Sequence, residues 1–255
     1  MTAWTPGALA PDPGAAPVGR MLASQTRAEL TLTLRNSEQV LLNLVIPLGL
    51  LVVLVLVPFV TVTGRRADFF VPGVLALAVM SSAFTGQAIA TGFERQYGVL
   101  KRLGATPLPR SVLLGAKTLG VLAVEVLQVL VLCVAGLALG WHPHGSVGGV
   151  LALVALGTAA FSGLGLLLGG TLRGLTTLAA ANLGWFVLLL LGGVVFPLSA
   201  FGGAADVLRL LPTAALSDGL RTLLQSGDLV GRDLLTLAVW ALVALVAAAK
   251  AFRWE

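Results

Sequence analysis

Charged residues are scarce in this 255-residue chain, at 11% of the sequence against 57% hydrophobic residues. A soluble domain carries about 25% charged residues. A chain with so few cannot cover a globule of its size with polar side chains, which excludes an ordinary soluble enzyme. The mean hydropathy of +0.98 agrees. Because the apolar residues form long runs instead of alternating with polar ones, an outer-membrane β-barrel is excluded as well.

Side chains that bind metals or carry out catalysis are also few. The one cysteine, Cys133, lies inside an apolar run, so no disulfide or cysteine metal site can be built from this sequence. The two histidines, His142 and His144, share a short loop without an accompanying acid, which indicates a solvated turn. The sequence has no HExxH motif, no paired intramembrane carboxylates and no phosphate-binding GxxxxGK[ST] loop. These absences argue against an intramembrane enzyme and against an ATPase site in this chain.

Long apolar runs are what the sequence has in abundance. A membrane-spanning helix needs about 20 mainly apolar residues. Six stretches meet this requirement, roughly at 39–61, 72–92, 111–140, 147–170, 176–197 and 233–250. Glycines four residues apart, as in Gly136/Gly140 and Gly165/Gly169, indicate closely packed helices. We therefore predict an all-α polytopic membrane protein with six transmembrane helices.

Three segments outside these runs have patterns of their own. Residues 1–19 are rich in Pro, Ala and Gly, which is typical of a disordered tail. Residues 21–36 have leucines spaced along one face among charged residues, which predicts an interfacial helix or a fraying extension of the first span. Residues 197–231 contain apolar parts that are too short to span the membrane. They predict a re-entrant or interfacial pair of short helices on the outer side, or a loop packed on the bundle.

The positive charges assign the two sides of the membrane. With a cytoplasmic N-terminus, eleven of the sixteen Lys and Arg residues fall inside and five outside, as the positive-inside rule expects. The acids then leave a net charge of +6 inside and zero outside, and Glu125 lies within a span. Both termini are therefore predicted to be cytoplasmic. The overall charge of +5 is too sparse for a surface that binds nucleic acid.

The longest basic cytoplasmic loop covers residues 93–110. On a helical projection Phe93, Tyr97 and Leu100 fall on one face. Gly104 is suited to ending such a helix, and the prolines that follow prevent it from continuing into the third span. The pattern predicts a short amphipathic helix over about 93–104. The alternative is that its apolar face rests on the bilayer and its basic face meets lipid headgroups. The charged residues lie away from the apolar stripe: Glu94, Arg95, Lys101 and Arg102.

This loop resembles the signature of ABC-2 type transporter permeases, in which Glu-Arg-Glu-x-Gly-Thr-Leu precedes Leu-x-x-Thr-Pro. Gln96 replaces the second acid of the signature, and Val99 replaces its threonine. The likeness extends over residues 20–253 and includes the six spans, the interfacial helix and the segment between the fifth and sixth spans. The chain itself reads Glu94-Arg-Gln-x-Gly98-Val-Leu-Lys-x-Leu103-x-x-Thr106-Pro107.

The resemblance implies a fold like that of type V ABC exporters and a role as permease subunit. In this family the loop between spans two and three is a coupling helix that sits in a cleft of a separate ATPase subunit. The chain would bind no cofactor itself, and ATP and Mg would bind to two copies of the ATPase. A second permease copy or a related chain would complete the exporter in the inner membrane of a bacterium. The expected ATPase-coupling residues are Glu94, Arg95, Tyr97, Gly98, Leu100, Lys101, Leu103, Thr106 and Pro107.

Polar residues inside the predicted spans are candidates for the substrate pathway. Glu125 has Gln128 on the same helix face, and Asn43, Gln87 and Asn182 are isolated amides in apolar surroundings. A carboxylate in hydrocarbon costs roughly 2.5–3.5 kcal/mol on insertion scales, so Glu125 needs a partner inside the bundle. It is either a structural hydrogen-bonding residue or a site for substrate or protons.

A lining of mostly Leu, Val, Ala and Gly suits a hydrophobic or amphipathic cargo such as a drug, an antibiotic or a lipid. The resemblance to ABC-2 permeases implies an ATP-driven exporter of such a cargo. The alternative is an ion-coupled secondary transporter or channel that uses Glu125.

Overall fold

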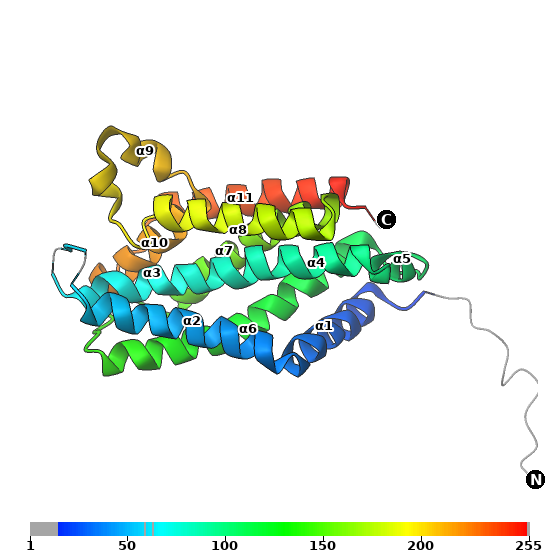
Figure 1. Ribbon diagram of the computed structural model, residues 1–255, viewed down its shortest axis with the longest axis horizontal. Coiled ribbons are helices and arrows are strands. Elements are labelled where there is room, and N and C mark those ends of the chain that lie inside the picture. Colours follow the sequence, from blue (N-terminus) through cyan, green and yellow to red (C-terminus); the bar gives the residue numbers. More distant parts are fainter. Residues whose placement is uncertain (1–14, 59, 63, 254–255) are drawn as a thin grey trace, which may run out of the picture.

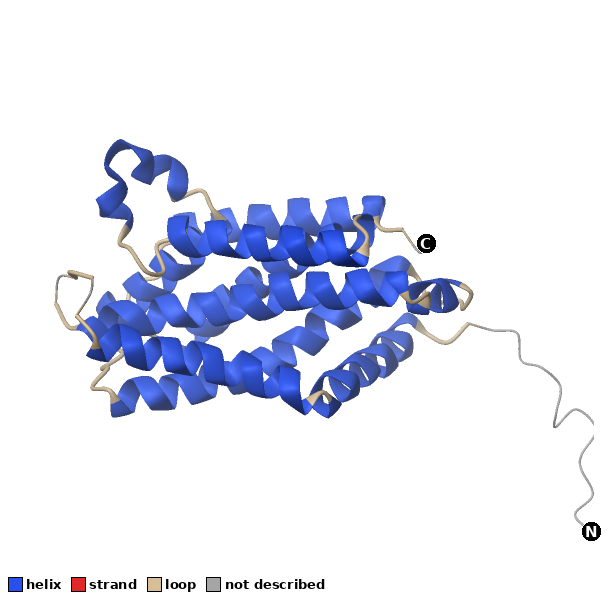
Figure 2. Cartoon of the chain, in the orientation of Figure 1, coloured by secondary structure: helices blue, strands red, loops and turns tan. Residues whose placement is uncertain are grey.

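The computed structural model describes residues 15–253 except residues 59 and 63. Within these residues the chain forms helices joined by turns and loops, and no β-strand (Figure 1, Figure 2). Five helical stretches among the described residues are long and apolar enough to cross a membrane. The helices α1 (Val18–Arg35) and α2 (Ser37–Leu56) meet at a bend of 68° and give a sixth crossing if they are counted together as one span. The predicted all-α membrane architecture is confirmed. The five stretches are Arg66–Gln96, Arg110–Ala138, Val147–Thr171, Gly174–Leu191 and Gly231–Ala251.

The second span forms the core of the bundle. It consists of α3 (Arg66–Met80), a π-helical segment η1 (Ser81–Gly86) and α4 (Gln87–Gln96). Every residue from Phe69 to Met80 is buried. A helix that is apolar on all sides is stable only when other helices surround it, and the neighbouring helices α2, α6 (Arg110–Ala138), α7 (Val147–Thr171) and α10 (Pro212–Ser226) do so here.

α7 packs against the second span and against α11 (Gly231–Ala251) at very short range. A β-carbon on Gly165 would lie 2.6 Å from the Phe84 carbonyl oxygen, and one on Gly169 would lie 2.5 Å from the Ala88 carbonyl oxygen. The Gly165/Gly169 pair therefore lets two helix backbones touch, as the sequence pattern indicates. The two glycines of the pair Gly136/Gly140 have different environments. Gly136 packs on Val71, whereas Gly140 has a φ of 83° in the turn after α6.

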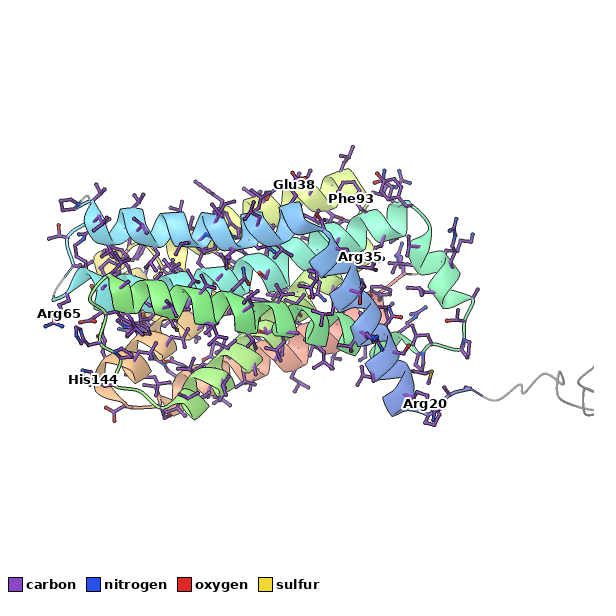
Figure 3. All side chains as sticks on the ribbon, turned by 90° about the horizontal axis from the view of Figure 1, so that it is seen from below. Arg20, Arg35, Glu38, Arg65, Phe93 and His144 are labelled. Carbon is purple, nitrogen blue, oxygen red and sulfur yellow. The ribbon has the colours of Figure 1, made fainter. Side chains whose placement is uncertain are left out.

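The two ends of the bundle carry different elements. We call the end that carries α5 (Val99–Gly104) and the end of α11 the α5 end, and the opposite one the α10 end (Figure 1). Arg20 lies toward the α5 end, and Arg65 and His144 lie at the α10 end (Figure 3). α1 begins at the α5 end and packs along the first part of α6 (Figure 1). Residues 1–14 of the predicted tail (1–19) lie outside the described residues, and α1 already begins at Val18, before the predicted residue 21.

The first span ends earlier than predicted, at Leu56 instead of residue 61. The guanidinium of Arg66 donates hydrogen bonds to the carbonyl oxygens of Leu54, Val55 and Val57 at 2.5, 3.0 and 2.6 Å. It thereby satisfies carbonyl groups that a further helical turn would otherwise have to satisfy. Arg66 also lies over the ring of Phe70, 5.1 Å from its centroid.

The fifth span, α8 (Gly174–Leu191), also ends before the predicted residue 197, and Gly193 follows it with a φ of 73°. The connection to α11 contains η2 (Leu198–Ala204), α9 (Ala205–Leu208) and α10. η2 and α9 project sideways from the bundle (Figure 1). The 15-residue α10 is too short to cross a membrane and packs on α3, α7 and α11 with most of its residues buried.

Candidate functional site

The loop between the second and third spans is two helices, not the single helix predicted over 93–104. α4 continues to Gln96, and α5 begins only at Val99. Gly98 lies between them with a φ of 72°, a left-handed conformation that glycine adopts without steric strain and that commonly ends a helix. The prediction missed this break because the apolar spacing around Gly98 is compatible with a continuous helix.

The break separates the three residues of the predicted apolar stripe. Leu100 is fully buried and packs in a cluster with Leu113 and Phe252. Tyr97 is 69% exposed, and its ring stacks on Phe93 with the centroids 6.0 Å apart. α5 is therefore anchored by Leu100 and presents other residues outward.

Most of the remaining residues of the motif lie on the surface of the α5 end. Lys101 and Pro107 are exposed, whereas Leu103 is half-buried at the edge of the cluster around Leu100. Thr106 is exposed, and its hydroxyl donates a hydrogen bond of 2.6 Å to the carbonyl of Leu103. This bond closes the turn after α5. The structure thus brings most of the predicted coupling residues onto one surface.

Glu94 has a different environment. The ammonium group of Lys117 in α6 lies 2.8 Å from the carboxylate of Glu94 in α4 and 3.0 Å from that of Glu29 in α1. Gln25 donates a further hydrogen bond of 2.9 Å to Glu29. Lys117 is buried, and the side chains of Glu29 and Glu94 are 15% and 24% exposed. This triad ties three helices together next to the loop. Lys117 is one of the eleven basic residues that the charge count assigns to the inner side, and no sequence pattern indicates that it is buried.

Arg95 faces another neighbour. Its guanidinium donates a hydrogen bond of 3.2 Å to the carbonyl of Leu172, in the connection between α7 and α8. Adjacent residues of α4 thus hold different parts of the bundle, with Glu94 bound to Lys117 of α6 and Arg95 bound to the α7–α8 connection.

Glu125 is fully buried between α6 and α7. The hydroxyl of Thr158 donates a hydrogen bond to one carboxylate oxygen of Glu125 and also lies 2.8 Å from the carbonyl of Val154. The other carboxylate oxygen has no hydrogen-bond partner among the described residues. Glu125 thus has the partner inside the bundle that its burial requires.

Gln128 and Asn43 are brought together by the structure. The side-chain amide of Gln128 donates a hydrogen bond of 2.7 Å to the backbone carbonyl of Asn43. The hydroxyl of Ser82 in η1 donates to the amide oxygen of Gln128 at 2.9 Å. The contact links the first three spans, and the backbone of Asn43, not its side chain, takes part in it.

Gln87 and Asn182 lie apart from this group. Ser162 in α7 donates a hydrogen bond of 2.9 Å to the side-chain oxygen of Gln87, whose amide nitrogen has no partner within the described part of the chain. Asn182 is exposed near the middle of α8. The five polar candidates therefore do not form one site.

The π-helical segment η1 was not expected from the sequence. Its first residue, Ser81, accepts a hydrogen bond of 2.8 Å from the indole N–H of Trp185 in α8, and its second, Ser82, contacts Gln128. Single-turn π-helices inside α-helices frequently mark functional sites. Hydropathy and helical periodicity carry no signal that distinguishes this turn from an α-helical one.

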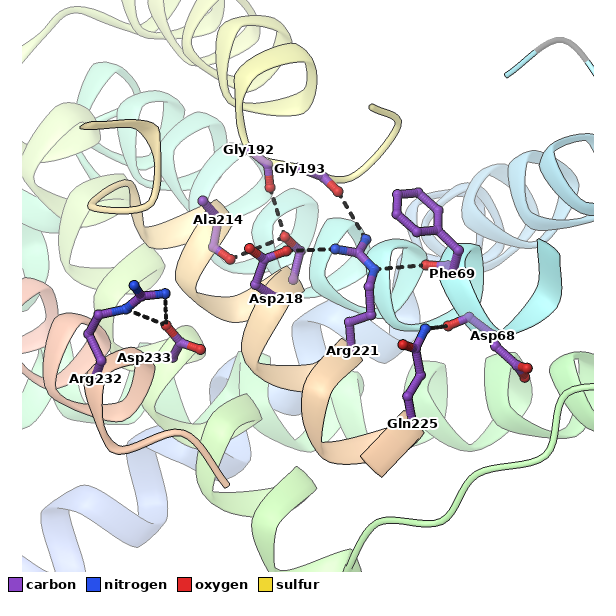
Figure 4. A network of polar contacts seen from close by, with 11 residues as sticks. Asp68, Phe69, Gly192, Gly193, Ala214, Asp218, Arg221, Gln225, Arg232 and Asp233 are labelled. Carbon is purple, nitrogen blue, oxygen red and sulfur yellow. Dashed lines mark hydrogen bonds and ion pairs between the residues drawn. The ribbon is translucent and has the colours of Figure 1, made fainter. Parts of the chain in front are cut away.

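A second polar network lies at the α10 end, around Arg221 of α10 (Figure 4). Its guanidinium contacts Asp218 at 2.6 Å and the carbonyl oxygens of Gly193 and Phe69 at 3.0 and 3.4 Å. It also lies 4.0 Å from the centroid of the Phe69 ring. Burial lowers the pKa of Arg221, and the carboxylate of Asp218 counteracts this shift. The network fixes α10 to α3 and to the end of α8.

No group of three or more His, Cys, Asp or Glu residues that could hold a metal ion occurs among the described residues. His142 lies in the turn after α6, where its ring nitrogen Nδ1 is 2.9 Å from both the Arg65 guanidinium and the Gly140 carbonyl oxygen.

Comparison with known proteins places this arrangement in a family. The family model described as ABC-2 family transporter protein matches residues 61–250, which is most of the chain and includes five of its six spans. No curated protein compared with the chain matches it.

Proposed function

The chain belongs to the ABC-2 family of transporter proteins, and on this premise we propose that it is the permease subunit of an ATP-driven exporter. As a family member it is a multi-pass membrane permease of an ABC transporter. ATP and Mg²⁺ would bind to a separate ATPase subunit, and the permease would form the path for the transported molecule.

The anchoring of α5 is the observation that carries this proposal. A subunit that receives mechanical work from a motor needs a rigid element that contacts the motor and is continuous with a span. α5 is fixed by the buried side chain of Leu100 and is joined through the turn at Gly98 to the 31-residue second span. A displacement of α5 would therefore move the core helix of the bundle.

The contact with the ATPase would involve the exposed side of this loop, with Tyr97, Lys101 and Thr106. Glu94, which the family motif nominates, is held by Lys117. We therefore assign Glu94 the role of connecting the loop to α1 and α6, and not of contacting the ATPase directly. This assignment also gives α1 a function, because any movement of α4 would be passed to it through Lys117.

The charge distribution supports a cytoplasmic α5 end. The eleven basic residues assigned to the inner side include those of α1, α5 and the end of α11, and such an excess is typical of cytoplasmic segments. In this orientation η2 and α9 would project at the outer side, and both termini would face the cytoplasm of a bacterial cell.

A second permease copy, or a related chain, would face this one to enclose the pathway, together with two ATPase copies. α8 supports this arrangement because it carries the exposed polar residue Asn182 directly before the exposed apolar residues Leu183 and Phe186. An amide near the middle of a span is costly next to lipid and is better placed against another protein surface or a pathway. The apolar residues around it suit a hydrophobic or amphipathic substrate such as a drug, an antibiotic or a lipid.

The test is reconstitution of the chain with a candidate ATPase subunit in liposomes. We expect ATP-dependent efflux of a hydrophobic dye, and we expect a Tyr97→Ala/Lys101→Glu variant to lose both efflux and co-purification of the ATPase. Arg20→Glu serves as control, because it also reverses the charge of an exposed basic residue at the α5 end. Full efflux by the double variant, with the ATPase still bound, would contradict the role of α5.

The second candidate function is an ion-coupled transporter or channel that uses Glu125. The buried carboxylate oxygen without a partner among the described residues favours it. This function requires transport by the chain alone, driven by a proton or cation gradient and lost in Glu125→Gln. If ATP and the ATPase are needed and Glu125→Gln retains transport, this candidate is wrong.

A further inference from the structure

A row of buried polar side chains runs inside the bundle from the middle of α6 toward the α5 end. Thr158 contacts Glu125, and the hydroxyl of Ser162 donates a hydrogen bond of 2.9 Å to the side-chain oxygen of Gln87. Where one helix contributes two of these residues, they are four positions apart and so lie on one face. None is more than 5% exposed. We call this set the polar row: Glu125 of α6, Thr158 and Ser162 of α7, and Gln87 and Thr91 of α4.

The hydrogen bonds of Thr158 bear on the protonation of Glu125. The hydroxyl of Thr158 is within hydrogen-bonding distance of two acceptors, the carbonyl of Val154 at 2.8 Å and one carboxyl oxygen of Glu125. A hydroxyl has one hydrogen to donate, but its oxygen can also accept. A carboxylate can receive that hydrogen, but the contact with Val154 then has none. Both contacts are hydrogen bonds when Glu125 is a neutral acid that donates to Thr158, while Thr158 donates to Val154.

The surroundings of Glu125 provide no cation that would stabilise a negative charge. Its side chain is fully buried, and no ion pair between described residues includes it. Removing an unpaired carboxylate from water is far more costly than removing the neutral acid. The cost of burial therefore favours the same protonated state as the hydrogen bonds.

The charged groups of the neighbouring helices lie too far from Glu125 to compensate for its burial. α7 and η1 contain no Asp, Glu, Lys or Arg, and α2, α3 and α11 have theirs in the first or last turn. Lys117 of α6 is bound to the acids of α1 and α4. Within the described part of the chain, burial and the contact with Thr158 govern the protonation of Glu125, without a contribution from a charged side chain. The arginines of α1 are exposed: Arg20, Arg27 and Arg35.

At the other end of the polar row, two polar groups are open. The side-chain nitrogen of Gln87 and the hydroxyl of Thr91 are buried and have no hydrogen-bond partner among the described residues. Threonines elsewhere in these helices, such as Thr118 and Thr171, donate to the carbonyl four residues earlier. Thr91 does not make this bond, so its hydroxyl is available to another group. A buried water molecule satisfies such groups where two or more polar partners surround it.

The polar row ends beside an open space. Gly92, which follows Thr91 in α4, lines a cleft of about 540 Å³ at the α5 end, between the end of α4 and the start of α8. Thr91 itself faces α7, because a β-carbon on Gly169 would lie 2.9 Å from the β-carbon of Thr91. Thr91 thus stands between the buried part of the row and the cleft.

We propose that Glu125 is a proton-binding site, neutral in the folded protein, that exchanges its proton with water at the α5 end through the polar row. Uptake forms an O–H bond on a carboxylate oxygen of Glu125 and takes the proton from water, and release reverses this step. The open groups of Gln87 and Thr91 hold the water molecules that pass the proton between the cleft and Ser162. Acids inside membrane spans commonly belong to such relays. The proposal holds with or without an ATPase, and it makes a proton the ion of the second candidate function.

The test uses the full chain, purified in a non-ionic detergent without an ATPase. Infrared spectra at neutral pH measure the C=O stretch of a protonated carboxylic acid, which is separate from the bands of carboxylates and amides. The difference between the wild type and Glu125→Gln isolates the contribution of Glu125. Transfer into D₂O shifts this band as the proton is replaced by a deuteron, so the rate of the shift measures the access of water to Glu125.

We expect the acid band of Glu125 in the wild type and its loss in Glu125→Gln. In Gln87→Leu/Thr91→Val the band should remain but exchange about tenfold more slowly, the effect of a barrier raised by the loss of two hydrogen-bonding groups. Thr91→Ser keeps the hydroxyl and should exchange like the wild type. The matched control is Thr118→Val, which removes a threonine hydroxyl of α6 outside the polar row and should leave the rate unchanged.

Three outcomes would overturn the proposal. Identical spectra of the wild type and Glu125→Gln would show that Glu125 is ionised. An unchanged exchange rate in Gln87→Leu/Thr91→Val would show that protons reach Glu125 by another route. Equal slowing in Thr91→Ser or Thr118→Val would show an effect of packing and not of the hydroxyl of Thr91. Because neither ATP nor transport enters the measurement, its failure leaves the exporter function open, and a failed efflux assay leaves this site open.

Discussion

The side chain of Gln128 in α6 donates a hydrogen bond to the backbone carbonyl of Asn43 in α2, 2.7 Å away. In a regular helix that carbonyl accepts from the N–H of residue 47, but residue 47 is a proline inside α2 and has no N–H. An unpaired carbonyl in the membrane costs several kcal/mol. Gln128 thus satisfies the group that Pro47 leaves open, and it joins the first span to the third.

Replacing Gln128 by leucine is expected to lower the free energy of unfolding by about 1 kcal/mol, the scale of hydrogen bonds between transmembrane helices. The substitution leaves the Asn43 carbonyl and the Ser82 hydroxyl without this partner. The measurement is unfolding of the purified chain in mixed detergent micelles. In a Pro47→Ala background the helix supplies its own N–H to Asn43, so Gln128→Leu should cost less. An equal cost in both backgrounds would contradict this explanation.

Lys117→Met is expected to destabilise the chain by about 2 kcal/mol, less than for a fully buried pair because both acids are partly exposed. It leaves Glu29 and Glu94 facing each other without a cation. Adding Glu29→Gln and Glu94→Gln to Lys117→Met should recover most of the loss, because no uncompensated charge remains. The control is Lys250→Met, an exposed lysine of α11, which should change stability little. Failure of the triple variant to recover would show that the charges are not the cause.

Gly98→Ala is expected to cost about 1–2 kcal/mol, because alanine is strained in the left-handed conformation that Gly98 adopts. The substitution should also favour a continuous helix through the loop, which displaces α5 and weakens coupling to an ATPase. The matched control is Gly49→Ala in α2, where the added methyl group has open space and should be neutral or slightly stabilising. Thermal unfolding and ATP-driven efflux are the two measurements. Equal effects of both substitutions would remove the special role of Gly98.

Gly165→Ala and Gly169→Ala are each expected to cost about 1–3 kcal/mol, the range for overpacking a tight contact. In both cases the new methyl group meets a backbone carbonyl of the second span and not a flexible side chain. Gly148→Ala in the same helix, where nothing lies within 4 Å, is the control. Unfolding in mixed micelles measures all three. If all three variants unfold alike, α7 does not approach the second span as closely as described.

The predicted coupling helix shows where sequence patterns were sufficient and where they were not. The motif located the loop correctly at one end of the second span, because its prolines and glycines interrupt the apolar runs. The projection of Phe93, Tyr97 and Leu100 onto one face was wrong, because the turn at Gly98 reorients everything after it. The spacing of apolar residues contains no information about a single residue with a positive φ.

The polar candidates inside the spans illustrate the same limit. That Glu125 and Gln128 require partners followed from the cost of polar groups in hydrocarbon, and each has one. Their partners lie 33 and 85 positions away in the sequence, so only the packing of the helices could identify them. Pro47 did offer a signal, since a proline inside a span always leaves one carbonyl without its helical donor.

By itself the sequence determined the membrane class, the approximate spans and the family-like loop. These depend on hydropathy and on short motifs, which are properties of residues taken in order along the chain. The tertiary structure decided which charges are paired and which remain at the surface. It brought Lys117 to Glu94 and placed Arg95 beside Arg173. The physical reason is that the energy of a charge in a low-dielectric interior depends on its neighbours in space, and folding alone sets these.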